Sequence, residues 1–415
     1  MSERRIIPLV VAPPAVATVP ERPQLAAPPP LALYVHYPWC VKKCPYCDFN
    51  SHTARGGTGD IPEDAYIDAL LADLESALPQ VWGRRVHSVF FGGGTPSLMS
   101  AAGLDRLLTC IRTLLPLDPL AEVTLEANPG TVEAARFRDY RAAGVNRLSL
   151  GIQSFDDAQL ARLGRIHDGR DARAAIDTAL AQFERVNLDL MYALPEQTVA
   201  AALADLDTAL AFGVGHLSCY HLTLEPNTPF HRSPPPLPDD DASADMQDAI
   251  EARLADAGFT HYETSAFARP GQECVHNLNY WTFGDYLGIG AGAHGKLSSH
   301  DGIVREMRHK HPARYLDASR TRDFVQERRD VGVAELPFEF MMNALRLTGG
   351  FPRRLFTERT GLPLAVIDTE LAAARERGLI EITADDIRPT ERGRRFLNDL
   401  LTLFLRDETA RRAPD

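Results

Sequence analysis

The sequence contains no continuous apolar run of the roughly 18 residues that a membrane-spanning helix requires, so we expect no membrane span. Prolines interrupt every apolar patch before Pro30, so these residues cannot form the helical segment of a signal peptide. The sequence also has few positive charges, with 44 Lys and Arg against 56 Asp and Glu, which gives a formal net charge of −12. This deficit argues against sequence-independent binding to nucleic acid, which depends on surplus positive charge. We therefore expect a cytoplasmic protein that does not bind nucleic acid.

Cysteine is scarce as well, with six residues in 415. Three of them are scattered along the chain, namely Cys110, Cys219 and Cys274. The other three, Cys40, Cys44 and Cys47, fall within eight positions. In a large cytoplasmic chain such a cluster indicates a metal site rather than a framework of disulfides.

A chain of this length is expected to form two or three folding units. Residues 31–267 alternate short apolar runs with stretches at the helical period, which predicts parallel strands joined by right-handed crossovers. We expect strands at Leu31–His36, Val86–Phe91, Val123–Ala127, Arg147–Gly151, Asn187–Met191 and His216–Leu222. We expect helices at Glu63–Leu78, Leu104–Leu115, Asp168–Phe183 and Ala242–Ala257. The pattern favours an α/β fold of the incomplete (β/α)6 barrel type, with a doubly wound sheet as the alternative.

Composition divides the chain into four parts. Residues 1–28 are rich in Pro and Ala and are expected to be a disordered leader. Residues 29–267 form the barrel core, and residues 268–330 form a Gly-rich, aromatic connecting segment. Residues 331–415 are mostly helical, with a hairpin at Gly378–Pro389, which predicts a winged-helix-like domain.

The clustered cysteines, Cys40-x3-Cys44-x2-Cys47, directly follow the first expected strand. A [4Fe–4S] cluster normally takes four thiolates, one for each iron. Three thiolates on one loop leave one iron open to a small molecule that can chelate it. The alternative is a zinc ion whose fourth ligand is His52.

A second motif, Gly92-Gly93-Gly94-Thr95-Pro96, ends the next expected strand. Glycines let the backbone approach a ligand closely and adopt dihedral angles closed to other residues. We expect a branched side chain at Gly94 to occupy the space of that ligand.

Taken in order, these two motifs and the segments Leu125–Pro129 and Ser149–Phe155 resemble the radical-SAM superfamily. Within it they resemble the oxygen-independent coproporphyrinogen III dehydrogenase branch, over roughly residues 31–296. The resemblance implies that Cys40, Cys44 and Cys47 hold a [4Fe–4S] cluster and that S-adenosylmethionine (SAM) binds its open iron. It also implies SAM contacts from Tyr34, Tyr46, Gly93, Gly94, Thr95, Glu126, Gln153, Arg165 and Asp189. For each of these residues alone, an ordinary capping or salt-bridge role is the alternative.

Two activities compete within this branch. The dehydrogenases, which use SAM for an oxidative decarboxylation in porphyrin biosynthesis, carry a fourth cysteine two positions beyond the third, where this chain has Phe49. The segment His276-Asn277-x-x-Tyr280-Trp281 instead resembles the HemW-type haem chaperones. That resemblance implies that haem binds to the protein and passes to an acceptor protein. The dehydrogenase activity stays as the alternative, and no catalytic residue is assigned.

Haem iron commonly takes an imidazole as axial ligand, and aromatic rings can cover the porphyrin. We therefore expect His276 to be the ligand, with Tyr280 and Trp281 as the aromatic cover. Cys274 and His294 are alternative ligands, and a purely structural role for His276 is the other interpretation. The acceptor, the productive cleavage of SAM and a homodimer are left open.

Overall fold

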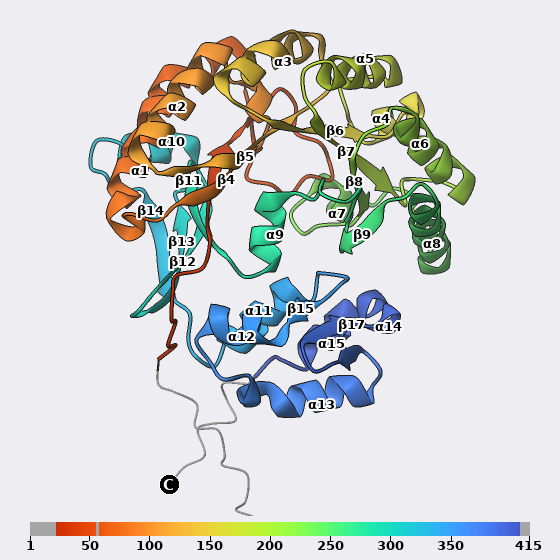
Figure 1. The fold of residues 1–415 in the computed structure, drawn as a ribbon. Coiled ribbons are helices and arrows are strands. Elements are labelled where there is room, and N and C mark those ends of the chain that lie inside the picture. Colours follow the sequence, from red (N-terminus) through yellow and green to blue (C-terminus); the bar gives the residue numbers. More distant parts are fainter. Residues whose placement is uncertain (1–21, 55–57, 407–415) are drawn as a thin grey trace, which may run out of the picture.

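The structure is a computed structural model that describes residues 22–54 and 58–406, except for the side chains of residues 58 and 131–135. Most of the expected leader, residues 1–21, lies outside the described residues. Within the described ranges, one sheet has twelve strands in the order β14-β13-β12-β11-β1-β4-β5-β6-β7-β8-β10-β9 (Figure 1).

The centre of this sheet is a run of parallel strands whose spatial order is their order in the chain. These strands are β1 (Leu31–Tyr37), β4 (Val86–Gly93), β5 (Leu117–Ala127), β6 (Arg147–Gln153), β7 (Arg185–Tyr192) and β8 (His216–His221). A doubly wound sheet would reverse its strand order at a switch point, and this sheet does not. The incomplete (β/α)6 barrel is therefore confirmed, and the strands lie where the apolar runs predict them, with small shifts at their ends.

Helices cover the outer face of these strands, as Figure 1 shows. They are α1 (Glu63–Val81), α2 (Ala101–Leu114), α3 (Thr131–Ala143), α4 (Asp157–Arg162), α5 (Gly169–Leu180), α6 (Val199–Ala211) and α8 (Asp240–Asp256). Helix α5 begins at a capping box, in which Asp168 and Asp171 each accept from the other's backbone N–H. Strands covered in this way are apolar almost throughout, so that all of β1 except Tyr34 is buried.

The sheet continues beyond the barrel on both sides. After β8 come β10 (Ala266–Ala268) and β9 (Thr260–Glu263), both antiparallel. On the other side β11 (Asp285–Ile289) pairs in parallel with β1 and is followed by the antiparallel strands β12 (His294–Ser299), β13 (Gly302–Arg308) and β14 (Val325–Asp330). Much of the expected connecting segment thus extends the barrel sheet. The short helix α9 (Val275–Trp281) contacts β1, β4 and β11.

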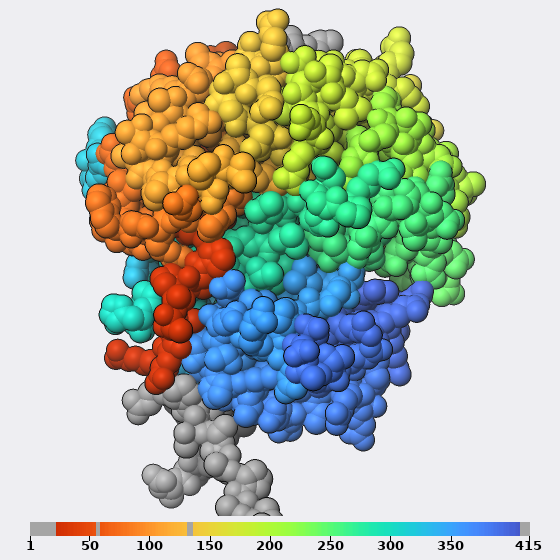
Figure 2. All heavy atoms as spheres, in the orientation of Figure 1, coloured from red at the N-terminus to blue at the C-terminus, as the bar shows by residue number. Residues whose placement is uncertain are grey.

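The C-terminal residues form a second apolar core. It joins α11 (Leu336–Ala344), α12 (Arg353–Thr360), α13 (Asp368–Glu376), α14 (Glu391–Arg395) and α15 (Leu397–Thr402) to a small sheet of β15 (Phe351–Pro352), β17 (Asp386–Pro389) and β16 (Ile380–Ile382). The β16–β17 hairpin is the one predicted, so the winged-helix-like domain is confirmed. Figure 2 shows this domain seated against the barrel. None of the helices in residues 22–54 and 58–406 combines the length and apolar composition that a bilayer crossing demands.

Candidate functional site

The three clustered cysteines lie on the loop that leaves the carboxyl end of β1. Two short strands, β2 (Trp39–Cys40) and β3 (His52–Thr53), pair in parallel and close this loop at its base. Cys40 is buried, whereas Cys44 and Cys47 are partly exposed, and all three line one cavity of about 300 Å³. Burial raises the pKa of the Cys40 and Cys47 thiols. The loop therefore brings all three sulfurs to a single cavity.

Glycines in the next loop pack directly against this cysteine loop. The amide of Gly94 donates to the Tyr37 carbonyl at 2.7 Å, and a Cβ atom on Gly94 would lie 2.6 Å from the Trp39 carbonyl oxygen. Gly93 has a φ of +118°, and a Cβ atom there would meet the His36 ring at 2.6 Å. The expectation that a side chain at Gly94 would enter the ligand space is therefore wrong, because that space is filled by backbone next to Cys40.

Most of the residues predicted to contact SAM line the same cavity. They are Tyr46, Gly93, Gly94, Thr95, Glu126, Gln153, Arg165 and Asp189. Tyr34 does not, because its hydroxyl bonds to His36 Nδ1 at 3.0 Å and its ring lines a second cavity. The barrel topology explains why these side chains lie together, since the carboxyl ends of parallel strands meet at one end of the barrel.

Arg165 is a partly buried cation of the cysteine cavity. Its guanidinium donates to Asn128 Oδ1 at 2.6 Å and to the Gly151 carbonyl at 2.8 Å, and it lies 3.7 Å from Cys44 Sγ. Its Nε atom is buried without a hydrogen-bond partner among the described residues. Nearby, Gln153 adopts a φ of 68°, a strained conformation that is common where a side chain is held for function.

Two carboxyl groups face the cavity from β5 and β7, the strands on either side of β6. Burial and the adjacent Asp189 raise the pKa of Glu126 to about 8, and Glu126 accepts from the Gly93 amide at 3.3 Å. Burial also raises the pKa of Asp189, while hydrogen bonds from Asn187 (2.8 Å) and Ser149 (3.2 Å) oppose that rise. The arrangement favours a cationic ligand, which would relieve the repulsion between the two carboxylates.

Several lining residues are not among the predicted contacts. They include Lys42, Lys43, Phe49, Ser51, Asn128, Ser149, Gly151, Met191 and Tyr220. Asn128 is the most informative, because it bonds to Arg165 and also donates to the Thr95 hydroxyl at 3.0 Å. It falls inside the segment Leu125–Pro129, so that motif could have identified it.

The zinc alternative requires His52 to join the cysteines. His52 does not line the cysteine cavity, and its ring packs against His311 with centroids 5.4 Å apart. Among the residues that the structure describes, no three His, Cys, Asp or Glu side chains are grouped to hold one metal ion. The side-chain positions therefore do not favour a mononuclear zinc site.

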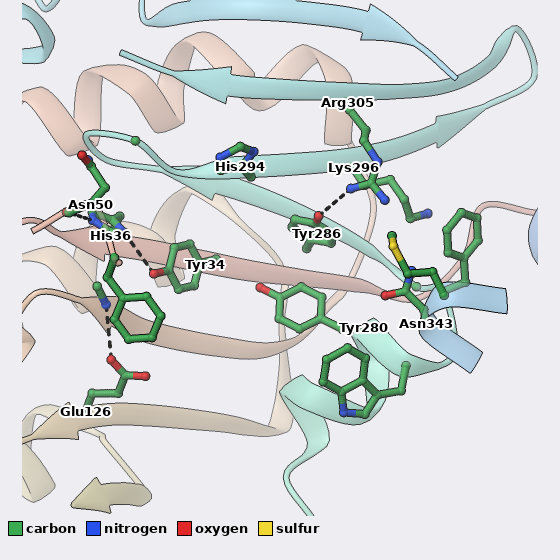
Figure 3. Close-up of a pocket in the computed structure, with 17 residues that line it drawn as sticks. Tyr34, His36, Asn50, Glu126, Tyr280, Tyr286, His294, Lys296, Arg305 and Asn343 are labelled. Atoms are coloured by element: carbon green, nitrogen blue, oxygen red, sulfur yellow. Dashed lines mark hydrogen bonds between the residues drawn. The ribbon is translucent and has the colours of Figure 1, made fainter. Parts of the chain in front are cut away.

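A second, larger cavity of about 500 Å³ adjoins the first (Figure 3). It is lined by Tyr34, His36, Phe49, Asn50, Gly93, Glu126, Tyr280, Trp281, Phe283, Gly284, Tyr286, Gly292, His294, Lys296, Arg305, Met342 and Asn343. The two cavities share Phe49, Gly93 and Glu126. Phe49, where the dehydrogenases carry cysteine, is 61% exposed and stands in this common wall.

Helix α9 carries the His-Asn-x-x-Tyr-Trp motif and begins on a buried carboxylate. Glu122 of β5 accepts from the amides of Val275 (3.2 Å) and His276 (3.1 Å), and its own charge is balanced by Arg185 at 2.9 Å. A carboxylate at this end satisfies helix donors that would otherwise lack partners. Glu122 thereby fixes the orientation of the motif against the barrel.

The residues of this motif have two kinds of surroundings: some are packed in the interior and others line the large cavity. His276 is 1% exposed, and its two ring nitrogens bond to Ser88 Oγ and the Tyr280 hydroxyl, both at 2.9 Å. Burial lowers the pKa of His276 to about 3, so its ring is neutral. Tyr280 and Trp281 line the large cavity, as expected for aromatic cover, but His276 does not.

The two alternative ligands also lie in different surroundings. Cys274 is fully buried, and its sulfur lies 3.4 Å from a Glu122 oxygen. His294 begins β12, is exposed, and lines the large cavity.

Comparison with known proteins extends the match to the whole chain. Residues 34–209 match the Radical SAM superfamily, and residues 333–396 match the HemN C-terminal domain. "Heme chaperone HemW" of Escherichia coli is 49% identical over 91% of this chain and 98% of its own length. "Heme chaperone HemW" of Bacillus subtilis is 33% identical over 90% and 98%.

Among solved structures, coproporphyrinogen III oxidase (HemN) from Escherichia coli superposes with a TM-score of 0.77 at 23% identity. The match covers 91% of this chain and 90% of that one, and at this identity it establishes the shared fold. The near-complete coverage of the more similar relatives decides the family. This chain belongs to the HemW family of radical SAM proteins.

Proposed function

We propose that this protein is a haem chaperone that binds haem and transfers it to an acceptor protein, and that it carries a [4Fe–4S] cluster and SAM. The observation that carries the proposal is the pair of adjoining cavities, one lined by three cysteines and the other by aromatic side chains. The relatives that match this chain almost end to end are named as haem chaperones.

The cysteine cavity fits an iron–sulfur cluster with one open iron. Cys40, Cys44 and Cys47 supply three thiols, and the guanidinium of Arg165 lies beside Cys44. When bound, the cluster would offer its fourth iron to SAM. The Trp39 and Tyr37 carbonyls, held by Thr95 and Gly94, keep the loop at the mouth of the barrel.

The remaining residues of this cavity suit the charges of SAM. Glu126 and Asp189 face a space in which a sulfonium and an ammonium group would reduce their mutual repulsion. Arg165, fixed by Asn128 and Gly151, is available to the carboxylate of SAM. Tyr46 lies beside Cys44 and Arg165 and covers this end of the cavity.

The large cavity suits a porphyrin. Its volume lies within the range of about 300–1,000 Å³ that is typical of small-molecule sites. Tyr280, Trp281, Phe283 and Tyr286 supply aromatic surface, and Tyr280 and Tyr286 pack edge to face with centroids 4.6 Å apart. Such walls cover the porphyrin while the open side of the cavity permits release.

Two measurements on one preparation test this function. Ferric haem is titrated into the purified protein without cluster or SAM, and the anaerobically reconstituted protein is assayed with SAM, a reductant and coproporphyrinogen III. We expect one haem per chain, release of that haem to excess apomyoglobin, and no protoporphyrinogen IX. Steady conversion of coproporphyrinogen III, or no haem binding, would overturn the proposal.

A further inference from the structure

A haem held in the large cavity requires an iron ligand among the residues that line it. Of the described side chains there, His36, His294 and Met342 carry the imidazole or thioether groups that haem iron prefers. Lys296 also lines the cavity, but its ammonium is buried and donates to Asp285 at 2.8 Å. The three tyrosines of the cavity have hydroxyls that bond to His36, His276 and Arg305, so the choice lies among two histidines and one methionine.

His36 is already engaged on both sides of its ring. Nδ1 bonds to the Tyr34 hydroxyl at 3.0 Å, and Nε2 lies 2.9 Å from the Asn50 carbonyl oxygen. Nε2 must donate its proton to that carbonyl, so Nδ1 accepts from Tyr34. No lone pair of His36 is left for iron.

His294 differs from His36 in the hydrogen bonding of its ring nitrogens. Its side chain is exposed to the cavity, and neither ring nitrogen bonds to a described residue. The backbone that carries this ring is nevertheless fixed, because the turn before β12 is bonded to the cysteine loop. Asn50, which follows the cysteines, donates to the carbonyl of Ala291 in that turn and to the carbonyl of Lys310 after β13, both at 2.9 Å.

Glycines make this close approach possible. Gly290 has a φ of +104°, and a Cβ atom there would meet the His36 carbonyl oxygen at 2.4 Å. Gly292 has a φ of +82°, and a Cβ atom there would meet the Asn50 amide at 2.2 Å. The strand that carries His294 is thus positioned by backbone contacts, while its ring stays free.

We propose that His294, and not His276, is the axial ligand of haem iron in the large cavity, an inference that rests on the proposed function. Figure 3 shows His294 on the strand side of the cavity and Tyr280 on helix α9. Lys310 and Arg305 place positive charge around the His294 ring. Burial, together with this charge, lowers the pKa of His294 and so favours the neutral imidazole that can ligate iron.

His276 takes a positioning role in this arrangement. Its ring holds the hydroxyl of Tyr280 at 2.9 Å from outside the large cavity. It therefore fixes one aromatic wall without reaching the iron.

The test is a ferric haem titration of the full-length protein and its His294→Ala variant, followed by absorption and EPR spectroscopy. We expect the variant to bind haem at least tenfold more weakly, with a shifted Soret band, and imidazole in solution to restore the wild-type spectrum. His300→Ala is the matched control, because His300 lies in the same β12–β13 hairpin with its side chain in solvent. The control is expected to match the wild type.

Two further outcomes keep the inference distinct from the proposed function. If the wild type binds no haem, the proposed function fails. If the wild type binds haem and His294→Ala shows an unchanged spectrum and affinity, His294 is not the ligand, although the chaperone function stands. A spectral change in Met342→Leu alone would assign the ligand to Met342 and overturn the inference.

Discussion

The guanidinium of Arg165 lies 3.7 Å from the Sγ atom of Cys44, the middle cysteine of the loop. Asn128 and the Gly151 carbonyl hold the guanidinium in this place, so the contact is built into the barrel mouth. The fixed positive charge therefore lies at the cysteine cavity, where it can pair with an anionic group of a ligand.

Replacing this residue tests the role of the charge. Arg165→Ala is expected to weaken SAM binding by tenfold or more, because the carboxylate of SAM loses its cationic partner, and to lower iron retention. Titration calorimetry with SAM and iron analysis after reconstitution measure both effects. Arg162→Ala is the control, since Arg162 pairs with Glu196 at the surface and lies on the preceding helix. Equal SAM affinity in both variants would remove Arg165 from the site.

The cysteines themselves provide the second prediction. Anaerobically reconstituted wild type is expected to contain about four irons per chain, as one [4Fe–4S] cluster requires. Its EPR spectrum is expected to change when SAM is added. The triple variant Cys40→Ala, Cys44→Ala, Cys47→Ala is expected to lose both properties, whereas Cys110→Ala keeps them. Stoichiometric zinc without iron in the wild type would contradict the radical-SAM assignment of this site.

Gly94 offers a test of how tightly the two loops pack. Gly94→Ala is expected to destabilise the protein by about 1–3 kcal/mol, the range for overpacking a tight contact. The added Cβ would meet backbone atoms of Pro38 and Trp39, which cannot turn away as a side chain can. Cluster loading is expected to fall as well, because Cys40 follows directly. Urea denaturation and iron content give the two readouts.

Gly349→Ala is the control for this variant, since an added Cβ there meets no atom within 4 Å. A Gly94→Ala variant as stable as Gly349→Ala would show that the loops can move apart without loss.

The raised pKa of Glu126 predicts how the stability of the protein depends on pH. Its pKa rises from 4.5 to about 8 in the folded protein, so its neutral form is favoured there. Between about pH 4.5 and 8 the unfolded chain loses this proton while the folded protein keeps it. The free energy of unfolding therefore falls as the pH rises through this range. Glu126→Gln does not titrate, and its stability advantage over wild type is expected to grow by about 4 kcal/mol between pH 5 and 8.5.

Urea denaturation of both proteins across this pH range measures the advantage. Glu184→Gln, which changes an exposed carboxyl, is the control. If the stability difference between Glu126→Gln and wild type does not change with pH, the carboxyl of Glu126 is solvated and its pKa is not raised.

His276 is expected to matter for stability. His276→Ala removes a buried ring and leaves the hydroxyls of Ser88 and Tyr280 without their partner. The expected loss in the free energy of unfolding is about 2–4 kcal/mol, from the cavity and the unpaired groups together. Denaturation of His276→Ala and His300→Ala, compared with wild type, measures it. Equal stability of the two variants would show that the buried ring contributes little.

The sequence identified the barrel strands because each is buried on both faces and reads as an apolar run. It did not reveal that β11 pairs with β1, because that contact joins segments more than 200 residues apart and period alone carries no pairing information. The cavity residues at strand ends were predictable from motif and topology together. Tyr34 stays a prediction as a SAM contact, and it shares with His36 the face of β1 that lines the larger cavity.

His276 marks a different limit. A histidine near aromatic residues in a sequence does not show whether its nitrogens are free, since this depends on partners such as Ser88 that are distant in the chain. The exposed His294 carries no such pattern around it, and only the folded turn shows that its ring is open.

Phe49, Gly93 and Glu126 line both cavities, so a molecule in either cavity would lie next to these three residues. Any shift of these residues that improves the fit in one cavity changes the fit in the other. Thermodynamic linkage then makes the effect reciprocal: the factor by which SAM alters the affinity for haem equals the factor by which haem alters the affinity for SAM. Cargo and cofactor would in this way report each other's presence across a single layer of side chains.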